Sequence, residues 1–292
     1  MPIVGGVPTG QRLITLGSLA FFNDPTPGVQ WKGLRLQGWD GGPGSSLQLD
    51  QKLLAPGGWR SSNPQLATRA LTLSGMIVGA TPDVVVAAAD RLKAAATLEE
   101  SLLQVDGDGV GLRTALVSRS GEVLVENTQT QLVKTFSVGL VAADPRKFGT
   151  PITLSTNLPA TTGGLTVPFT VPFTIAATTV TGQVSATNPG NIDGPVTVRV
   201  SGPVDSPTVA HVGPDGTVDT FAISLSLGAG EWVDIDMEAR TVLAQGQSSR
   251  AQWVTSRGWA GFKPGLNTWA FTNAGAYSSG ASVSVTATPA WE

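Results

Sequence analysis

One strand–helix–strand stretch, residues 69–105, constrains the fold more than any other part of the sequence. Apolar side chains recur up to Val78, and a Gly-Ala pair then interrupts the strand. Thr81 offers a hydroxyl N-cap, and Pro82 suits the first helical turn because the N–H that it lacks would have no partner there. The pattern therefore predicts a helix that begins at Pro82 and is followed by a strand that begins near residue 102.

The apolar face of this helix consists mostly of small side chains. Residues of that face recur at helical spacing, whereas the opposite side is polar, with Asp83, Asp90, Lys93 and Thr97. Small side chains let a helix lie close against a flat sheet. We therefore expect a β-rich domain with this helix as its lid. The expected buried face is Val85, Ala88, Ala89, Leu92, Ala95 and Ala96.

The rest of the sequence favours strands joined by tight turns. Of its 292 residues 36 are glycine and only 13% are charged, and the length suffices for two cores. Apolar and polar residues alternate at 196–201, 223–227, 233–238 and 283–285, which is typical of a β-sandwich. We predict a mainly β protein with a one-helix domain at 1–149, an uncharged bridge at 150–181 and a sandwich at 182–292.

Within the first domain, the pattern predicts several short strands. Two are expected at residues 12–22 and 29–37, on either side of an Asn-Asp-Pro turn. Three more are expected at 112–119, 122–127 and 132–141, with a turn at Ser120-Gly121 between the first two. Asp106 and Asp108 lack the downstream glutamate of a calcium loop, so they are expected in a hairpin turn.

Two uncharged or glycine-rich segments are expected to pack against something outside their own domain. Residues 39–64 are too rich in glycine and proline to form an element, yet too long to persist without order. We predict that a neighbouring copy or partner orders this loop through Leu47, Leu49, Leu53, Leu54 and Trp59. In the bridge, a Thr-Val-Pro-Phe repeat places Phe169 and Phe173 on one face of an edge strand, which favours a domain seam.

The composition argues against several functional classes. The absence of cysteine removes thiol nucleophiles and thiolate metal sites, and the formal net charge of −3 comes without a basic patch for nucleic acid. The first residues, MPIVGGVPTG, have neither the basic nor the apolar region of a secretory leader, and no apolar run approaches the ~20 residues of a membrane helix, so we expect neither export through a leader nor membrane insertion. His211 is the single histidine, in a stretch without a nucleophile motif, and we expect it at the surface or in a turn. We assign no catalytic, cofactor or metal residue.

Two alternatives remain open in the second half. One face of a predicted strand carries three carboxylates, Asp234, Asp236 and Glu238. Their spacing overlaps that of the carboxylate pair of a glycosidase, and a weak calcium site is a further possibility. The same pattern also describes a solvated strand face opposite three apolar residues. Five of the eight tryptophans lie in this half and either stack on sugars or fill the core. These are Trp232, Trp253, Trp259, Trp269 and Trp291.

The order of several segments resembles one known family. An N-terminal strand pair and a long Gly/Pro loop precede NPQLATRALTLSGMI and the helix; ADPRKFG then leads to the uncharged GGLTVPFTVPFTI. NPGNIDGPVTVRVSG, GEWVDIDMEARTV and GWAGFKPGLNTWAF follow in the sandwich. Across nearly the whole chain, this set is similar to the distal tail proteins of long, non-contractile-tailed bacteriophages.

The resemblance implies a structural virion protein without enzymatic activity or cofactor. Its first domain would be tail-tube-like and close into a homohexameric ring at the tail tip, around a lumen through which DNA passes without specific binding. Its second would be a galectin-like sandwich. The ring would join the tail tube protein to the baseplate hub or tail-fibre proteins, after synthesis in the host cytoplasm. The runner-up functions are a carbohydrate-binding module that recognises the host envelope and, more weakly, a glycoside hydrolase.

Overall fold

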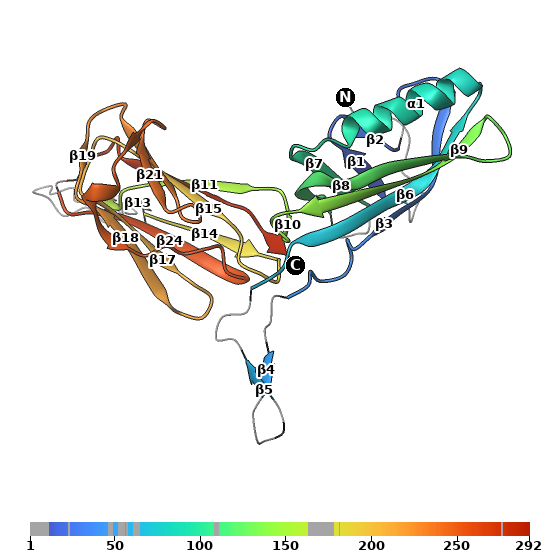
Figure 1. The fold of residues 1–292 in the computed structure, drawn as a ribbon. Coiled ribbons are helices and arrows are strands. Elements are labelled where there is room, and N and C mark those ends of the chain that lie inside the picture. The colour runs from blue at the N-terminus through green and yellow to red at the C-terminus, as the bar shows by residue number, and fades with distance from the viewer. Residues whose placement is uncertain are drawn as a thin grey trace, which may run out of the picture. The chain divides into compact units, whose positions relative to one another are not determined.

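The computed structural model describes residues 12–22, 24–45, 49–51, 56, 58–60, 65–107, 111–162, 178–180, 182–275 and 277–292. The structure is mainly β, as predicted, with one α-helix among the described residues. It divides into two compact units (Figure 1). The first comprises Met1–Gly149 with Glu292, and the second comprises Thr150–Trp291.

A curled antiparallel sheet forms the first unit, in the order β2-β1-β7-β8-β9-β6-β3. Every neighbouring pair along this order is antiparallel. β10 pairs with the first half of β8, and β4 and β5 form a separate two-stranded sheet. The strands are β1 Leu13–Leu16, β2 Leu19–Ala20, β3 Val29–Gln37, β4 Leu49–Gln51, β5 Gly58–Arg60, β6 Arg69–Gly79, β7 Ser101–Asp106, β8 Arg113–Asn127, β9 Val133–Ala142 and β10 Lys147–Phe148.

The helix α1, Pro82–Ala95, begins where the sequence predicts and packs on β6, β2 and β3. Its expected apolar face is buried and belongs to the same core as the inner face of the sheet. Gly79 is required at the end of β6 because an added Cβ would lie 2.4 Å from Val85 Cγ2. The capping prediction was wrong in one respect: Thr81 is the N-cap residue, but its side chain makes no capping hydrogen bond.

The turn predicted at Ser120-Gly121 was also wrong, because β8 continues through this point as one strand. The register with β9 shifts between Arg119 and Val123, so the Ser-Gly pair lies in a bulge. Gly121 has φ +84°, a conformation that glycine adopts without strain. Across the pair, an added Cβ at Gly139 would lie 2.3 Å from the Ser120 carbonyl oxygen. Glycines on both strands therefore turn an apparent hairpin into a bent strand.

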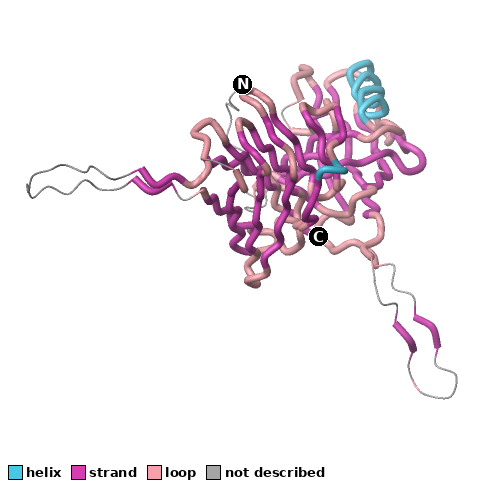
Figure 2. Tube along the Cα trace, turned by 90° about the vertical axis from the view of Figure 1, so that its left-hand side faces the viewer, coloured by secondary structure: helices cyan, strands magenta, loops and turns pink. Residues whose placement is uncertain are grey.

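Two sheets share one hydrophobic core in the second unit, which is the arrangement of a β-sandwich (Figures 1 and 2). The six-stranded sheet has the order β11-β25-β15-β20-β21-β22, and the five-stranded sheet has the order β14-β24-β17-β18-β23. The first comprises β11 Ile152–Asn157, β25 Ser282–Ala287, β15 Val196–Ser201, β20 Trp232–Asp236, β21 Thr241–Ala244 and β22 Ser248–Ser249. The second comprises β14 Gln183–Asn188, β24 Gly265–Asn273, β17 Pro207–Val212, β18 Val218–Ile223 and β23 Val254–Arg257.

Short elements complete this unit: β12 Ala160–Thr162 pairs with β13 Thr178–Val180, and β16 Val204–Asp205 with β19 Ser226–Leu227. β26 is Ala290–Trp291, and the 3-10 helix η1 is Ala251–Trp253. Part of the expected bridge at 150–181 is a strand of the sandwich, because β11 pairs along its length with β25. Among the described helices, none is long and apolar enough to cross a membrane.

Candidate functional site

The residues predicted to form the assembly surface lie mostly beyond what the structure describes. Leu47, Leu53 and Leu54 are outside the described residues, as are Phe169 and Phe173 of the predicted seam. Leu49 lies in β4 and Trp59 in β5, and only their backbones are described. These two strands pair within the 39–64 loop, so the prediction that this segment contains no element was wrong. The proposed role of the seven side chains stays a prediction.

Two buried cations fix the first residues of this loop. The Arg69 guanidinium donates through Nε to Pro145 O at 2.8 Å, and through Nη1 to Gly38 O at 2.8 Å and Gly41 O at 2.6 Å. Lys147 Nζ donates to Trp39 O at 3.0 Å and lies 5.9 Å from the centre of the Trp39 ring. The loop therefore leaves the domain from a base that is held by charge-assisted hydrogen bonds.

Burial of these two charges has an electrostatic cost. Arg69 is 2% exposed and Lys147 is 3% exposed. Burial, together with the nearby positive charges of Arg69 and Arg113, lowers the pKa of Lys147 to about 8. Burial likewise lowers the pKa of Arg69. Sequence reasoning missed both residues, because an arginine at a strand start and a lysine in a charged turn look like ordinary surface residues.

A groove of about 700 Å³ runs between β1 and β3 of the first unit. Phe21, Trp31 and Leu34 give it apolar walls, whereas Lys32 and Arg35 add positive charge. The third basic side chain in the lining, Arg12, is neutralised by a two-point ion pair with Asp40, with distances of 2.7 and 2.9 Å. The groove thus lies along the outer edge of the sheet, which ends at β3.

Asp24 connects the helix to this edge strand. Its carboxylate accepts from Arg91 Nη1 of α1 at 2.8 Å and from Trp31 Nε1 of β3 at 2.8 Å. Burial by itself raises the pKa of Asp24, but the hydrogen bonds from Arg91, Trp31 and Thr26 outweigh it and lower the pKa to about 2. The contact fixes the position of β3 relative to the helix.

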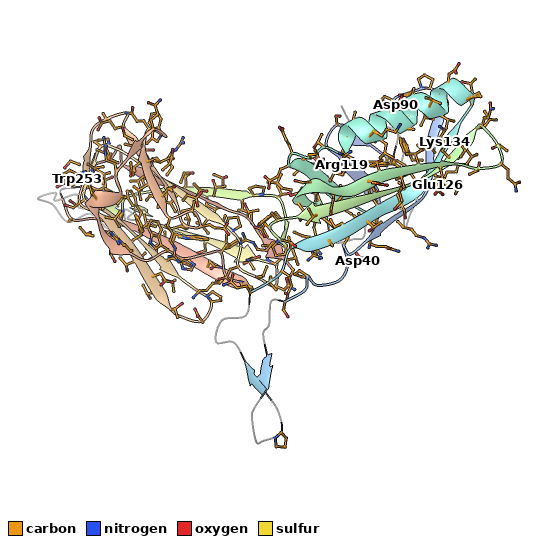
Figure 3. All side chains as sticks on the ribbon, in the orientation of Figure 1. Asp40, Asp90, Arg119, Glu126, Lys134 and Trp253 are labelled. Atoms are coloured by element: carbon orange, nitrogen blue, oxygen red, sulfur yellow. The ribbon has the colours of Figure 1, made fainter. Side chains whose placement is uncertain are left out.

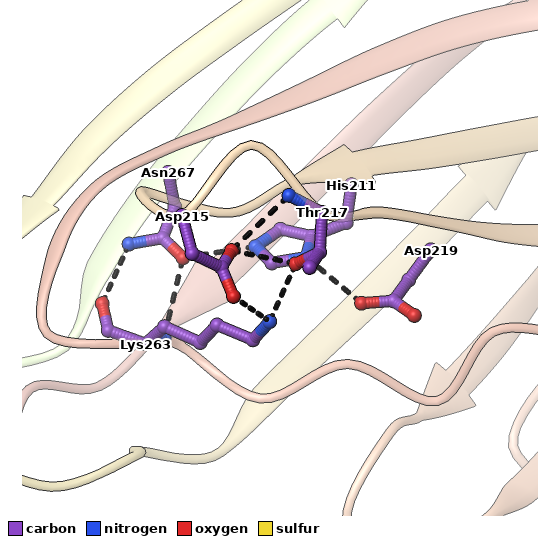
Figure 4. Close-up of polar contacts among 6 residues, drawn as sticks. All are labelled: His211, Asp215, Thr217, Asp219, Lys263 and Asn267. Atoms are coloured by element: carbon purple, nitrogen blue, oxygen red, sulfur yellow. Dashed lines mark hydrogen bonds and ion pairs between the residues drawn. The ribbon is translucent and has the colours of Figure 1, made fainter.

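The expectation for His211 was wrong: this side chain lies in β17 and is only 3% exposed. Its Nε2 lies 2.9 Å from Asn267 Oδ1, and its Nδ1 lies 3.8 Å from Asp219 Oδ2 (Figure 4). Asn267 Nδ2 donates to Lys263 O at 2.7 Å and to Gly265 O at 2.8 Å. Because the amide nitrogen donates twice, Oδ1 is the acceptor, and the proton between the two side chains belongs to His211 Nε2.

A charged part of the same cluster holds the turn between β17 and β18. Lys263 Nζ contacts Asp215 Oδ2 at 3.3 Å and Thr217 Oγ1 at 2.7 Å (Figure 4). Hydrogen bonds from Thr217, and then the contact with Lys263, lower the pKa of Asp215 to about 2. The cluster contains no serine or cysteine nucleophile. Its donors and acceptors bind one another except for His211 Nδ1, which has no hydrogen-bond partner among the described residues. Its chemistry is that of a structural network that joins two loops of the sandwich.

The acidic strand has the geometry of a solvated face. Val233, Ile235 and Met237 are buried, as the alternation predicts. Asp234 receives a two-point ion pair from Arg199 at 2.6 and 3.0 Å. Asp236 accepts from the backbone N–H groups of Glu238 and Ala239. The expectation that Glu238 shares the strand face was wrong, because β20 ends at Asp236 and Glu238 lies in the following turn. Within the described residues, no group of three or more His, Cys, Asp or Glu side chains is placed to hold a metal ion.

The five sandwich tryptophans do not form an aromatic platform. Trp269 is fully buried beside Phe262, and Trp259 packs on Phe221 with ring centres 4.7 Å apart. The ring of Trp232 lies 5.5 Å from the guanidinium of Arg199. Trp253 is 46% exposed, at the end of η1 (Figure 3), whereas Trp291 is half-buried in β26. The rings therefore serve packing more than sugar stacking.

No protein-family model matches the chain, and no curated protein matches it. Its fold is similar to that of the Dit protein of phage SPP1, described as a paradigm of the hub adsorption apparatus in phages that infect Gram-positive bacteria. The TM-score is 0.67 at 10% identity, over 97% of this chain and 100% of that one. The activated baseplate of phage P2 gives TM-scores of 0.49 with calcium and 0.46 with strontium, at 9% and 8% identity and 95% coverage of this chain. The predicted resemblance to distal tail proteins is thus confirmed for the fold, over nearly the whole chain.

Proposed function

We propose that this protein is a structural component of a phage tail tip. The observation that carries the proposal is the fold shared with SPP1 Dit over 97% of this chain and 100% of that one, at a TM-score of 0.67. A match over two units in the same order is more specific than a likeness of one sandwich, because sandwiches serve many functions. The self-contained network around His211 and the paired carboxylates of the acidic strand add support, since neither leaves an open catalytic arrangement.

In this proposal, six copies close into a ring by rotational symmetry around a lumen for DNA. The ring assembles in the host cytoplasm and becomes part of the virion, where one face meets the tail tube protein and the other meets hub or tail-fibre proteins. The first unit, within residues 1–149, forms the ring, and the sandwich is peripheral. The anchored base of the 39–64 loop supports a further contact, in which Leu47, Leu49, Leu53, Leu54 and Trp59 meet a neighbouring copy or the tube.

Electron microscopy and a gene deletion test the proposal together. Negative-stain images of the purified protein are expected to show closed rings with a central hole. Particles assembled without the gene are expected to lack a completed tail tip, and the plasmid-borne protein is expected to restore it. Normal, infectious tails in the deletion strain would overturn the proposal. Retention of the purified protein on cell-envelope glycan, without rings, would favour the carbohydrate-binding alternative instead.

A further inference from the structure

Two of the described strands in the first unit have unpaired edges that carry opposite charge. The second half of β8 pairs with β9 on one side, and no described strand pairs with it on the other. That half carries Glu122, Leu124 and Glu126, all exposed, with Leu124 at 50%. At the far end of the order β8-β9-β6-β3, the strand β3 is also unpaired on its outer side and carries exposed Lys32 and Arg35.

The pairing register places these charges in the same transverse rows of the sheet. One row reads Glu126, Thr135, Met76 and Lys32, and the next reads Leu124, Ser137, Ser74 and Arg35. Both rows lie on the face opposite the core, because the alternate residues of the same strands, such as Leu73 and Val138, are buried. Each row therefore ends in a basic residue at β3, and the glutamates are confined to the β8 edge (Glu126 is labelled in Figure 3).

Within one copy, these four charged side chains have no ion-pair partner among the described residues. An isolated edge strand invites pairing with another chain, and charges on the edge normally prevent it. Here the charges at the two edges are opposite, so each edge repels a copy of itself and attracts the other. Such a surface favours head-to-tail contacts over two-fold contacts, and head-to-tail contacts close into rings.

Strand direction agrees with such a contact. The segment has four strands, each antiparallel to its neighbour, so β3 and the second half of β8 run in opposite directions. Copies related by rotation about an axis roughly parallel to the strands keep the same strand directions. When β3 of one copy meets β8 of the next, the two strands are therefore antiparallel, and the alternation continues through the contact.

We propose that β3 of one copy pairs with the Glu122–Asn127 half of β8 of the next copy, with Lys32 and Arg35 against Glu122 and Glu126. If the transverse rows of the two copies are aligned, Lys32 of one copy lies opposite Glu126 of the next. If β3 is shifted by two residues along β8, the side chains stay on the same face and Arg35 lies opposite one of the two glutamates. This inference rests on the proposed ring, for which it names the subunit contact.

Charge reversal in the full-length protein tests the contact, with oligomeric state measured by analytical ultracentrifugation at low salt. The first variant is Lys32→Glu/Arg35→Glu, and the second is Glu122→Lys/Glu126→Lys. Each variant alone has like charges at both edges, and its self-association is expected to be weaker by at least roughly tenfold. The fourfold variant, which reverses both edges, is expected to recover the wild-type oligomer. The control Glu99→Lys/Glu100→Lys makes the same charge change as the second variant, at exposed positions outside β3 and β8.

A mixing experiment makes the test specific for head-to-tail pairing. Equal amounts of the two edge variants are expected to assemble with each other into alternating rings, because each supplies the charge that the other needs. Circular dichroism verifies that every variant is folded. If the wild type forms rings and both variants do so equally well, the inference is overturned while the proposed function stands. Variants that form rings but fail to join tails would also overturn it, by assigning the edges to another partner. A wild type that stays monomeric alone and is absent from virions would overturn the proposed function as well.

Discussion

Replacement of Arg69 by methionine is expected to destabilise the first unit and release the base of the 39–64 loop. The change removes a 2%-exposed guanidinium that donates to carbonyl oxygens of Pro145, Gly38 and Gly41. Methionine fills much of the same volume, so the loss is mainly that of hydrogen bonds. The three carbonyl groups would lose these donors at a partly buried site.

The magnitude follows from opposing contributions. Each hydrogen bond to a charged group contributes about 1.5–3 kcal/mol, and each buried acceptor left without a partner costs about 1–3 kcal/mol. Removal of the guanidinium also relieves its desolvation, and Arg69 Nη2 has no hydrogen-bond partner among the described residues. We expect a net loss of about 3 kcal/mol, which lowers the melting temperature of a unit of this size by roughly 10 °C.

Differential scanning calorimetry of the full chain measures this loss, and hydrogen exchange at residues 38–41 reports the loop base. Only the transition of the first unit is expected to move. Arg69→Lys keeps the positive charge but lacks the planar guanidinium, so its melting temperature is expected to lie between those of the wild type and Arg69→Met. Lys93→Met is the matched control, since that side chain is exposed on α1, outside the proposed subunit contact. A variant that melts within about 2 °C of the wild type, or unchanged exchange at the loop base, would refute the reasoning.

Three further predictions concern the pH dependence of stability and the sandwich. Hydrogen bonds lower the folded-state pKa of Asp24 to about 2, so the ionised carboxylate stabilises the fold above pH 4 and this stability is lost as the pH falls toward 2. Asp24→Asn is expected to reduce the free energy of unfolding by about 2 kcal/mol at pH 7. Urea titrations of this variant are expected to show a weaker loss of stability at acid pH than the wild type. Burial lowers the folded-state pKa of Lys147 from 10.5 to about 8, so between these pH values the unfolded chain binds more protons than the folded chain. The free energy of unfolding therefore rises with pH across that interval. Lys147→Met is expected to remove this rise, and an unchanged dependence of stability on pH would contradict the assignment. Asn267→Asp leaves two carbonyls without donors in a fully buried site and is expected to lower only the sandwich transition, by about 2–4 kcal/mol, whereas equal stability would mean that the cluster around His211 contributes nothing.

The domain boundary can be tested with fragments. A fragment of residues 150–292 is expected to fold alone, whereas 182–292 lacks β11, which pairs with β25 and packs Ile152 and Leu154 on the core. The shorter fragment is therefore expected to be less stable and to aggregate through the exposed β25 edge. Equal urea midpoints for the two fragments would place β11 outside the folding unit. Light scattering on residues 1–149 would then test whether ring closure belongs to the first unit.

The sequence by itself determined the features that depend on neighbouring residues. Helical spacing and Pro82 located α1 and its buried face, and strict alternation located β15, β20 and β25. These signals are local because a side chain's direction in a helix or strand follows from the backbone geometry of a few residues. The ordered set of segments was also sufficient to indicate the distal tail fold.

Only the tertiary structure decided which polar residues are buried and which strands have free edges. Arg69 and His211 look like surface residues in the sequence, and they are buried where carbonyl and amide oxygens from distant segments accept hydrogen bonds from them. The Ser120-Gly121 pair forms a bulge because β9 presents a glycine opposite it. Glu126 and Lys32 share a row only because β9 and β6 lie between their strands. Pairing between distant strands sets these features, and no local pattern encodes it.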